Sequence, residues 1–204
     1  MEQDALIIER IRAGDENAFE EIVISYQKRI YSLCYRMTGN EQDAYDLAQE
    51  VFLRVYRNLQ GFKGDSSFST WIYRITSNIC VDHLRRSKRA KVISLTPADD
   101  EAAEVALPDD TYSPEKSYSK REIAEVITKA LESLSNDHRQ MIILRDINQL
   151  TYDEIGEILE LEPGTVKSRI FRAREQLRRI LLSEHRNLFS NLPSNSVKGG
   201  EPNV

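Results

Sequence analysis

Apolar side chains recur every three or four residues along most of this chain, which is the period of an α-helix. The clearest stripe lies in residues 41–60 and consists of Ala44, Leu47, Ala48, Val51, Phe52, Val55, Tyr56 and Leu59. No alternating strand pattern competes with it, and Gly and Pro are scarce, at 8 and 6 residues. The sequence therefore predicts an all-α protein whose helices pack through such stripes.

Two more helices are predicted beside residues 41–60. The upstream helix has its apolar residues at Phe19, Ile22, Val23, Tyr26, Ile30, Leu33 and Met37. It should end at Thr38-Gly39-Asn40, because glycine commonly follows a helix C-terminus. The downstream helix carries Phe68, Ile72, Ile75 and Ile79 at steps of four, three and four. Together they define a first small helical domain, which we place in residues 1–91.

The pattern breaks in residues 92–118, where the acidic side chains between positions 99 and 110 have no basic neighbour and three prolines interrupt any helix. This composition predicts a flexible acidic linker. Periodicity resumes at Ile123 and continues to Leu182, so we place a second small helical domain in residues 119–182. Residues 183–204 are rich in Asn, Ser, Gly and Pro, and we expect them to form a disordered tail.

The second domain contains a helix-turn-helix pattern. Thr151 and Glu154 have the spacing of a capping box, which starts a helix. Leu161-Glu162-Pro163-Gly164 should form the turn, with the glycine relaxing it and the proline in the first position of the next helix.

The final helix has two contrasting faces. At about 100° per residue, the side chains within about 40° of Val166 are apolar: Ile170, Ala173, Leu177 and Ile180. The opposite face is basic and holds Lys167, Ser168, Phe171, Arg172, Glu175, Arg178 and Arg179, flanked by Arg169 and Arg174. An outward Phe171 suits contact with a thymine methyl group. A solvated basic face is the alternative, but the preceding helix is acidic, and this segregation of charge favours DNA recognition.

Aromatic and basic residues also gather between Gly61 and Lys91. Phe62, Phe68 and Trp71 precede a run of cations that begins at Arg85. Aromatic rings stack on unpaired bases while cations hold the phosphates, so single-stranded DNA is a candidate ligand. The alternative is that Phe68 and Trp71 are core residues and the basic run is a solvated helix end. For Phe68 we favour the core.

These motifs, in this order, resemble the extracytoplasmic-function (ECF) sigma factors of the sigma-70 family over roughly residues 15–182. Residues 43–53 are similar to region 2.2, the helix that docks on the clamp coiled coil of the largest polymerase subunit. The resemblance implies five polymerase-binding residues: Asp43, Asp46, Gln49, Glu50 and Leu53. Tyr45 departs from the family pattern, because many relatives carry a carboxylate there, and it would weaken or alter docking.

Residues 68–78 and 82–86 resemble regions 2.3 and 2.4, which open the minus-ten promoter element. The implied contacts are Phe62, Lys63, Trp71, Arg74, Asn78, Arg85, Arg86 and Lys88. Of these, Phe62 and Asn78 would line a pocket for a flipped base. Residues 165–174 resemble the region 4.2 helix, which reads the minus-thirty-five element. The implied contacts there are Thr165, Lys167, Ser168, Arg169, Phe171, Arg172 and Arg174.

The resemblance also implies partners. Core RNA polymerase would bind through the clamp coiled coil of its largest subunit and the flap of its second subunit, and promoter DNA would be the other ligand. An anti-sigma factor, membrane-anchored for many relatives, would control the chain in a stress or envelope response. No cofactor, metal or small-molecule substrate is expected. Polymerase would supply the catalysis, so the chain itself would not be an enzyme.

Composition adds limits to this interpretation. The 204 residues are 40% hydrophobic and 30% charged, and no apolar run approaches the roughly 20 residues of a membrane-spanning helix. The N-terminus lacks a signal-peptide pattern, so we expect a cytoplasmic protein, held at the inner face of the membrane when a membrane-anchored inhibitor binds it. The net charge of -5 predicts weak DNA binding until polymerase tethers the chain. Cys34 and Cys80 are too few for a disulfide framework or a zinc cluster, and both should be buried.

Two other function classes compete with this interpretation. A conventional helix-turn-helix regulator with a ligand-sensing or dimerisation domain would leave the segment from Phe62 to Lys91 unexplained. An enzyme acting on nucleic acid would need a metal site or a general acid and base, yet His83, His138 and His185 lie in unrelated segments. His138, beside a predicted helix start, is interpreted as a surface residue.

Overall fold

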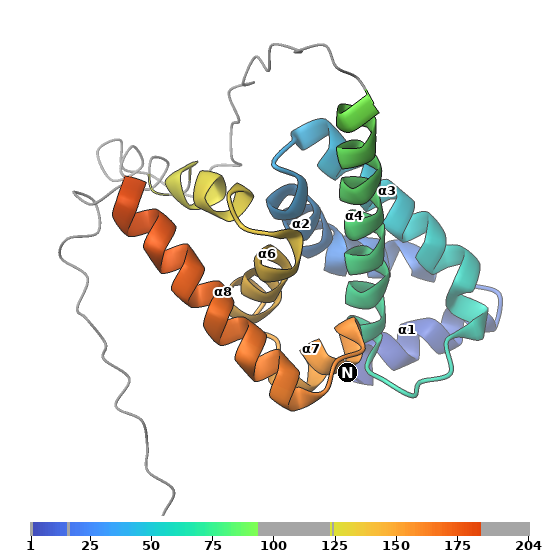
Figure 1. Ribbon diagram of the computed structural model, residues 1–204. Helices are drawn as coiled ribbons and strands as arrows, with labels where there is room; N and C mark the ends of the chain where they lie inside the picture. The colour runs from blue at the N-terminus through green and yellow to red at the C-terminus, as the bar shows by residue number, and fades with distance from the viewer. Residues whose placement is uncertain (1, 16, 94–122, 124, 185–204) are drawn as a thin grey trace, which may run out of the picture.

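The computed structural model describes residues 2–15, 17–93, 123 and 125–184, and all the regular secondary structure among them is helical (Figure 1). The N-terminal half consists of α1 (Glu2–Arg12), α2 (Ala18–Thr38), α3 (Glu41–Asn58), the short 3-10 helix η1 (Leu59–Gly61) and α4 (Phe68–Ile93). The C-terminal half begins with a helical segment at 125–132. It continues with α6 (Asn136–Ile142), the π-helical turn η2 (Ile143–Ile147), α7 (Tyr152–Leu159) and α8 (Pro163–Glu184). The all-α prediction is confirmed.

The three predicted N-terminal helices form where the pattern placed them. Gly39 ends α2 in the left-handed conformation, with φ 72°, and its N–H donates to the carbonyl of Tyr35. Asn40 then caps α3 by accepting a hydrogen bond from the Asp43 N–H. The predicted α3 stripe was wrong at one residue, Tyr56. Tyr56 is 47% exposed, because it lies at the margin of the buried face, and its ring makes an edge contact with that of Phe19.

Helix α1 is not among the helices that the sequence predicts. It buries Ile7, Ile8 and Ile11 against the bundle, and this helical spacing was visible in the sequence. Its end is tied down by Arg10, which forms ion pairs of 2.7 Å with both Asp15 and Glu21. The helix therefore completes a four-helix N-terminal half, in which α2 packs against α1, α3 and α4 (Figure 1).

The C-terminal half contains the predicted helix-turn-helix. Both capping-box bonds between Thr151 and Glu154 are present at the start of α7, and Pro163 is the first residue of α8. The expected role of Gly164 was wrong. Glu160 takes the left-handed conformation that ends α7, with φ 54°, so Gly164 does not need to relax the turn. The glycine that matters is Gly156, where a Cβ would lie 2.8 Å from the Leu161 carbonyl oxygen.

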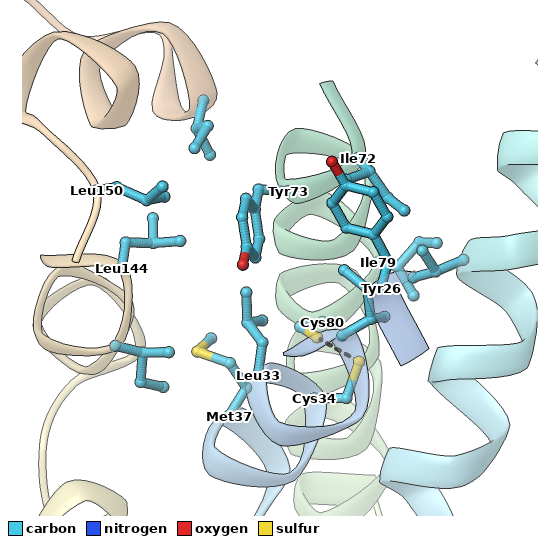
Figure 2. Packing of buried hydrophobic residues seen from close by; sticks show 14 of the residues in the cluster. Tyr26, Leu33, Cys34, Met37, Ile72, Tyr73, Ile79, Cys80, Leu144 and Leu150 are labelled. Atoms are coloured by element: carbon cyan, nitrogen blue, oxygen red, sulfur yellow. Dashed lines mark hydrogen bonds between the residues drawn. The ribbon is translucent and has the colours of Figure 1, made fainter. Parts of the chain in front are cut away.

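One continuous hydrophobic core runs through both halves, which the prediction of two modules on a linker did not include. Helix α4 packs against α7, and α2 and α4 both touch α6. Figure 2 shows Leu33, Met37 and Tyr73 of the N-terminal half facing Leu144 and Leu150 of the C-terminal half. Within the predicted linker, residues 92 and 93 extend α4. The rest of that linker, and residues 185–204 of the predicted tail, lie outside the described residues.

Candidate nucleic-acid and polymerase interface

Helix α8 separates an apolar face from a cationic face as the sequence predicts. Val166, Ile170 and Ala173 are buried, and Leu177 and Ile180 are half-buried. On the other side, six side chains of the predicted basic face are exposed: Lys167, Ser168, Phe171, Arg172, Arg178 and Arg179. Phe171 is 65% exposed, which is unusual for a large apolar ring. These six side chains of α8 are thus open to solvent in the part of the chain that the structure describes.

Arg174 differs from the other arginines of the cationic face, because its guanidinium is paired with a carboxylate. Nε donates to Asp146 Oδ2 at 3.1 Å, and Nη2 donates to Asp146 Oδ1. These bonds raise the pKa of Arg174. Asp146 belongs to the π-helical turn η2, so the pair fastens α8 to that turn. Thr165 and Arg169, also predicted DNA contacts, are half-buried at the edge of the cationic face.

Helix α4 presents a narrow stripe instead of a broad face. At about 100° per residue, Trp71, Arg74, Asn78 and Arg85 fall within about 60° of one another. Asn78 and Arg85 are exposed, while Trp71 and Arg74 are half-buried. Arg86 and Lys88 are exposed beside this stripe. Arg89 is exposed on the same line and was missed as a candidate, although the helical period alone would have placed it there.

Aromatic rings cluster at the N-terminal end of the α4 stripe. The Phe62 ring centroid lies 5.1 Å from that of Trp71 and 5.7 Å from that of Phe68, and Phe68 in turn packs edge-on against Tyr26. Phe68 is buried, so its predicted core role is confirmed. Phe62 and Trp71 are each half-buried, and Lys63 beside them is exposed to solvent. The cluster therefore offers two supported aromatic surfaces next to a cation, as base stacking requires.

The outer face of α3 combines carboxylates with an exposed leucine. Asp43, Asp46, Gln49, Glu50 and Leu53 lie within about 120° of one another on the helix. Leu53 is 54% exposed, and Asp46 and Gln49 are exposed beside it. Asp43 and Glu50 are half-buried, because Asp43 lies 3.2 Å from His83 Nε2 and Glu50 pairs with Arg54 at 2.5 Å. Tyr45, at 56% exposure, extends this surface.

Two family models match the chain on these same elements. Sigma-70 region 2 matches residues 22–90, and Sigma-70, region 4 matches residues 124–177. The ECF RNA polymerase sigma factor SigW of Bacillus subtilis is 39% identical over 176 residues, which cover 85% of this chain and 94% of that protein. The chain belongs to the ECF sigma factors. It is therefore a transcription initiation factor that brings RNA polymerase to promoters, and the regulator alternative is overturned by the region 2 match.

Other relatives agree with this assignment. The RNA polymerase sigma-H factor of Pseudomonas aeruginosa is 39% identical over 183 residues, which cover 88% of this sigma factor and 94% of that protein. Among solved structures, CnrH in complex with the cytosolic domain of CnrY matches with a TM-score of 0.64 at 23% identity, covering 88% of this chain and 97% of that one. RpoE bound to the anti-sigma factor NepR, from Bartonella quintana, matches with a TM-score of 0.65 at 22% identity, covering 81% of this chain and 98% of that one. Both structures share the fold.

The cysteines and His138 of the sigma factor complete the comparison with the sequence predictions. Cys34 and Cys80 are both buried, as expected, and their Sγ atoms lie 3.7 Å apart, which raises the pKa of Cys80. In the part of the chain that the structure describes, no three His, Cys, Asp or Glu side chains are grouped to hold a metal.

The prediction that His138 is a surface residue was wrong in part. It is half-buried, and Nδ1 lies 2.6 Å from Gln176 Oε1 of α8. Of the helices that are described, none has the length and apolarity to cross a bilayer.

Proposed function

We propose that this sigma factor uses three separate surfaces: the outer face of α3 for polymerase, the stripe of α4 for the melted minus-ten element, and the cationic face of α8 for the minus-thirty-five element. The observation that carries this proposal is the sorting of charge among the helices. The outer face of α3 carries Asp43, Asp46 and Glu50, with the cation Arg54 paired to Glu50, whereas arginines and lysines line the exposed sides of α4 and α8. Duplex or single-stranded DNA is drawn to the second kind of surface and repelled by the first.

For α3, the chemistry fits a protein partner. Asp43, Asp46, Gln49, Glu50 and Leu53 would contact the clamp coiled coil of the largest polymerase subunit. An exposed leucine surrounded by carboxylates can bury apolar area while the charges select a basic partner. Tyr45 adds apolar area where many relatives have a charge, so its ring would pack against the coiled coil. The C-terminal half would contact the flap of the second subunit.

For α4, the chemistry fits unpaired bases. Phe62 and Trp71 would stack on them, Asn78 would hydrogen-bond a base flipped out of the duplex, and Arg74 would reach the adjoining strand. The phosphates of the minus-ten strand would lie along the remaining cations, which are Lys63, Arg85, Arg86 and Lys88. Because Phe62 is buttressed by Phe68 and Trp71, its ring is already oriented before DNA arrives.

For α8, the chemistry fits the major groove. Lys167, Ser168, Arg169 and Arg172 would contact phosphates and base edges, with Thr165 at the helix start and Phe171 against a thymine methyl group. We assign Arg174 an indirect role in this set. Its bonds to Asp146 orient α8, so it would support the DNA-reading residues from within the domain.

The remaining part of the proposal concerns location and control. A solved relative, RpoE of Bartonella quintana, is bound to an anti-sigma factor, and we propose that an anti-sigma factor also controls this chain in a stress or envelope response. It would act in the cytoplasm, at the inner face of the membrane if its inhibitor is anchored there. It would contribute no catalysis, because polymerase performs the chemistry.

In vitro run-off transcription from a library of genomic fragments tests the proposal. Core polymerase with this chain should initiate at a restricted set of sites that core polymerase alone does not use. Asp46→Ala with Gln49→Ala should abolish stoichiometric capture of core polymerase. Glu9→Ala with Glu20→Ala, at exposed positions on α1 and α2, is the matched control and should leave capture unchanged. Failure of the unmodified chain to select start sites would overturn the proposal.

A further inference from the structure

Helix α1 lies outside the part of the chain that matches Sigma-70 region 2, because that match begins at residue 22. The helix is nevertheless firmly attached to the bundle. Its three isoleucines are buried, and it packs against α2. It ends in a turn at Gly14, which has φ 99° and whose N–H donates to the Ile11 carbonyl at 3.0 Å. The C-terminal end of α1, and with it the backbone of Arg12, is therefore held in one place.

Arg12 connects the end of α1 to the loop that precedes α4. Its Nη2 atom donates to the carbonyl oxygen of Phe62. The N–H of Phe62 donates to the carbonyl of Leu59 in η1 at 3.2 Å. Both backbone polar groups of Phe62 thus have partners, one in η1 and one in α1. Figure 1 shows this loop passing beside α1 on its way to α4.

Helix α1 also supports the aromatic cluster from below, at a second point. The hydroxyl of buried Tyr26 donates to Asp4 Oδ2 at 2.9 Å. Burial and then this bond raise the pKa of Tyr26, so the hydroxyl stays a donor. The Tyr26 ring packs edge-on against Phe68, with centroids 5.5 Å apart, and Phe68 packs against Phe62. Asp4 and Arg12 are about 12 Å apart along α1, so the helix holds the cluster at two separate places.

Among the rings of the cluster, Phe62 depends most on the loop. Phe68 and Trp71 belong to α4, whereas Phe62 precedes that helix in an extended conformation with ψ 111°. The carbonyl that Arg12 holds belongs to the peptide group that follows the Phe62 Cα. Rotation of this peptide group would change the Phe62 backbone and move its ring relative to Trp71, whose centroid is 5.1 Å away. A guanidinium bond to the carbonyl opposes that rotation.

We infer that Arg12 is a positioning residue for base capture, which holds the Phe62 ring in the orientation that accepts an unpaired base of the minus-ten element. The inference rests on the proposed function of the α4 stripe. Arg12 acts through the Phe62 backbone and not by touching DNA. Helix α1 thereby becomes part of the minus-ten surface, because a ring that is already oriented loses less freedom when a base stacks on it.

Holoenzyme binding to a single-stranded oligonucleotide tests this inference. The oligonucleotide carries the minus-ten element of a promoter that run-off transcription identifies, and a second series replaces each base in turn with an abasic site. In the parent holoenzyme, one abasic site should weaken binding more than its neighbours, because the stacked base is missing. Phe62→Ala should weaken binding to the intact oligonucleotide and should remove the extra penalty of that abasic site.

Arg12→Ala should weaken binding to the intact oligonucleotide about threefold to tenfold, the usual effect of one lost hydrogen bond. Capture of core polymerase should be unchanged. Because Arg12 acts through Phe62, the loss should disappear at the abasic site and in the Phe62→Ala background. Arg10→Ala is the matched control. It removes the same charge from the same helix, but Arg10 pairs with Asp15 and Glu21, so binding should stay at the parent level.

Losses that add up in the variant combining Arg12→Ala with Phe62→Ala, with a salt dependence lower by about 0.7 of a counterion, would mean that Arg12 contacts a phosphate. That result would overturn the inference. An Arg12→Ala variant that binds like the parent, or an equal loss from Arg10→Ala, would overturn it too, and both results leave the role of Phe62 intact. If Phe62→Ala itself bound the intact oligonucleotide as well as the parent does, the proposed function of the α4 stripe would fail, and the inference with it.

Discussion

Helices α4 and α8 are the two long cationic helices of this sigma factor, and they are packed in opposite ways. Helix α4 is enclosed by α2 and α3 on one side and by α7 on the other, so in its first half Asn78 is exposed and Trp71 and Arg74 are half-buried, and the helix opens to solvent beyond Arg85. Helix α8 buries little beyond Val166, Ile170 and Ala173, and most of its circumference is open. An enclosed helix exposes few side chains to a ligand, but its packing holds them rigidly. An open helix exposes many side chains, and these act more independently.

The largest expected effect tests the enclosure of α4. Ile72→Ala removes a fully buried side chain and should lower the free energy of unfolding by about 2–5 kcal/mol. Leu177→Ala on α8 is the comparison. Because Leu177 is half-buried, the cost should be about half as large, since less apolar area is lost. Urea denaturation followed by circular dichroism measures both. Equal costs would mean that α8 is as enclosed in solution as α4.

The difference in packing between α4 and α8 also explains how well the sequence predicted each helix. On α8 one apolar stripe faces α6 and α7 of the same half, so the helical period alone located both faces correctly. On α4 the period selected Phe68, Ile72 and Ile79 but also Ile75, which is half-buried, and it missed buried Tyr73 and Thr76. Those two residues lie on a second side of α4. The helix that packs against α4 from the C-terminal half, α7, is far away in the sequence, so the local pattern gave no sign that a second side would be buried.

The contact between the halves could not have been predicted from the pattern. It depends on Arg139, Tyr73 and Asn148, which are ordinary polar residues in a sequence and become informative only when the fold brings them together. The pairing of Arg174 with Asp146 was hidden for a similar reason, because Asp146 lies in a π-helical turn that no spacing rule indicated. By contrast, the polymerase and DNA faces lie on single helices, and the spacing within one helix is enough to group them.

The next effect concerns the enclosed aromatic cluster. Trp71→Ala should reduce open-complex formation by the free energy of stacking one base, about 1–3 kcal/mol. Trp71→Phe keeps an aromatic face and should retain most of the activity. Permanganate reactivity of thymines in the minus-ten element measures melting, with binding to core polymerase as the check that the fold is intact. Full melting activity of Trp71→Ala would show that the ring is only a packing residue of α4.

A smaller effect is expected from the open helix. If Phe171 packs on a thymine methyl group, replacing that thymine with uracil should weaken holoenzyme binding by about 0.8 kcal/mol, the value of one buried methyl group. Phe171→Ala should weaken binding as well and should make the uracil substitution silent. Competition binding over each thymine of the minus-thirty-five element would identify the contact. Additive losses at every thymine would mean that the ring contacts sugars or no DNA at all.

The smallest effect distinguishes a positioning arginine from a DNA-contacting one on α8. Both partners of the pair between Arg174 and Asp146 are about half or a third exposed, so its loss should cost the fold no more than about 0.5 kcal/mol. If Arg174 only orients α8, Arg174→Ala and Asp146→Ala should weaken promoter binding equally, and the double variant should be no weaker than either single one. If Arg174 instead reaches a phosphate, only its removal should lower the salt dependence of binding, by about one counterion. Asp146→Ala would then leave binding unchanged or strengthen it, because a freed guanidinium could turn toward the DNA.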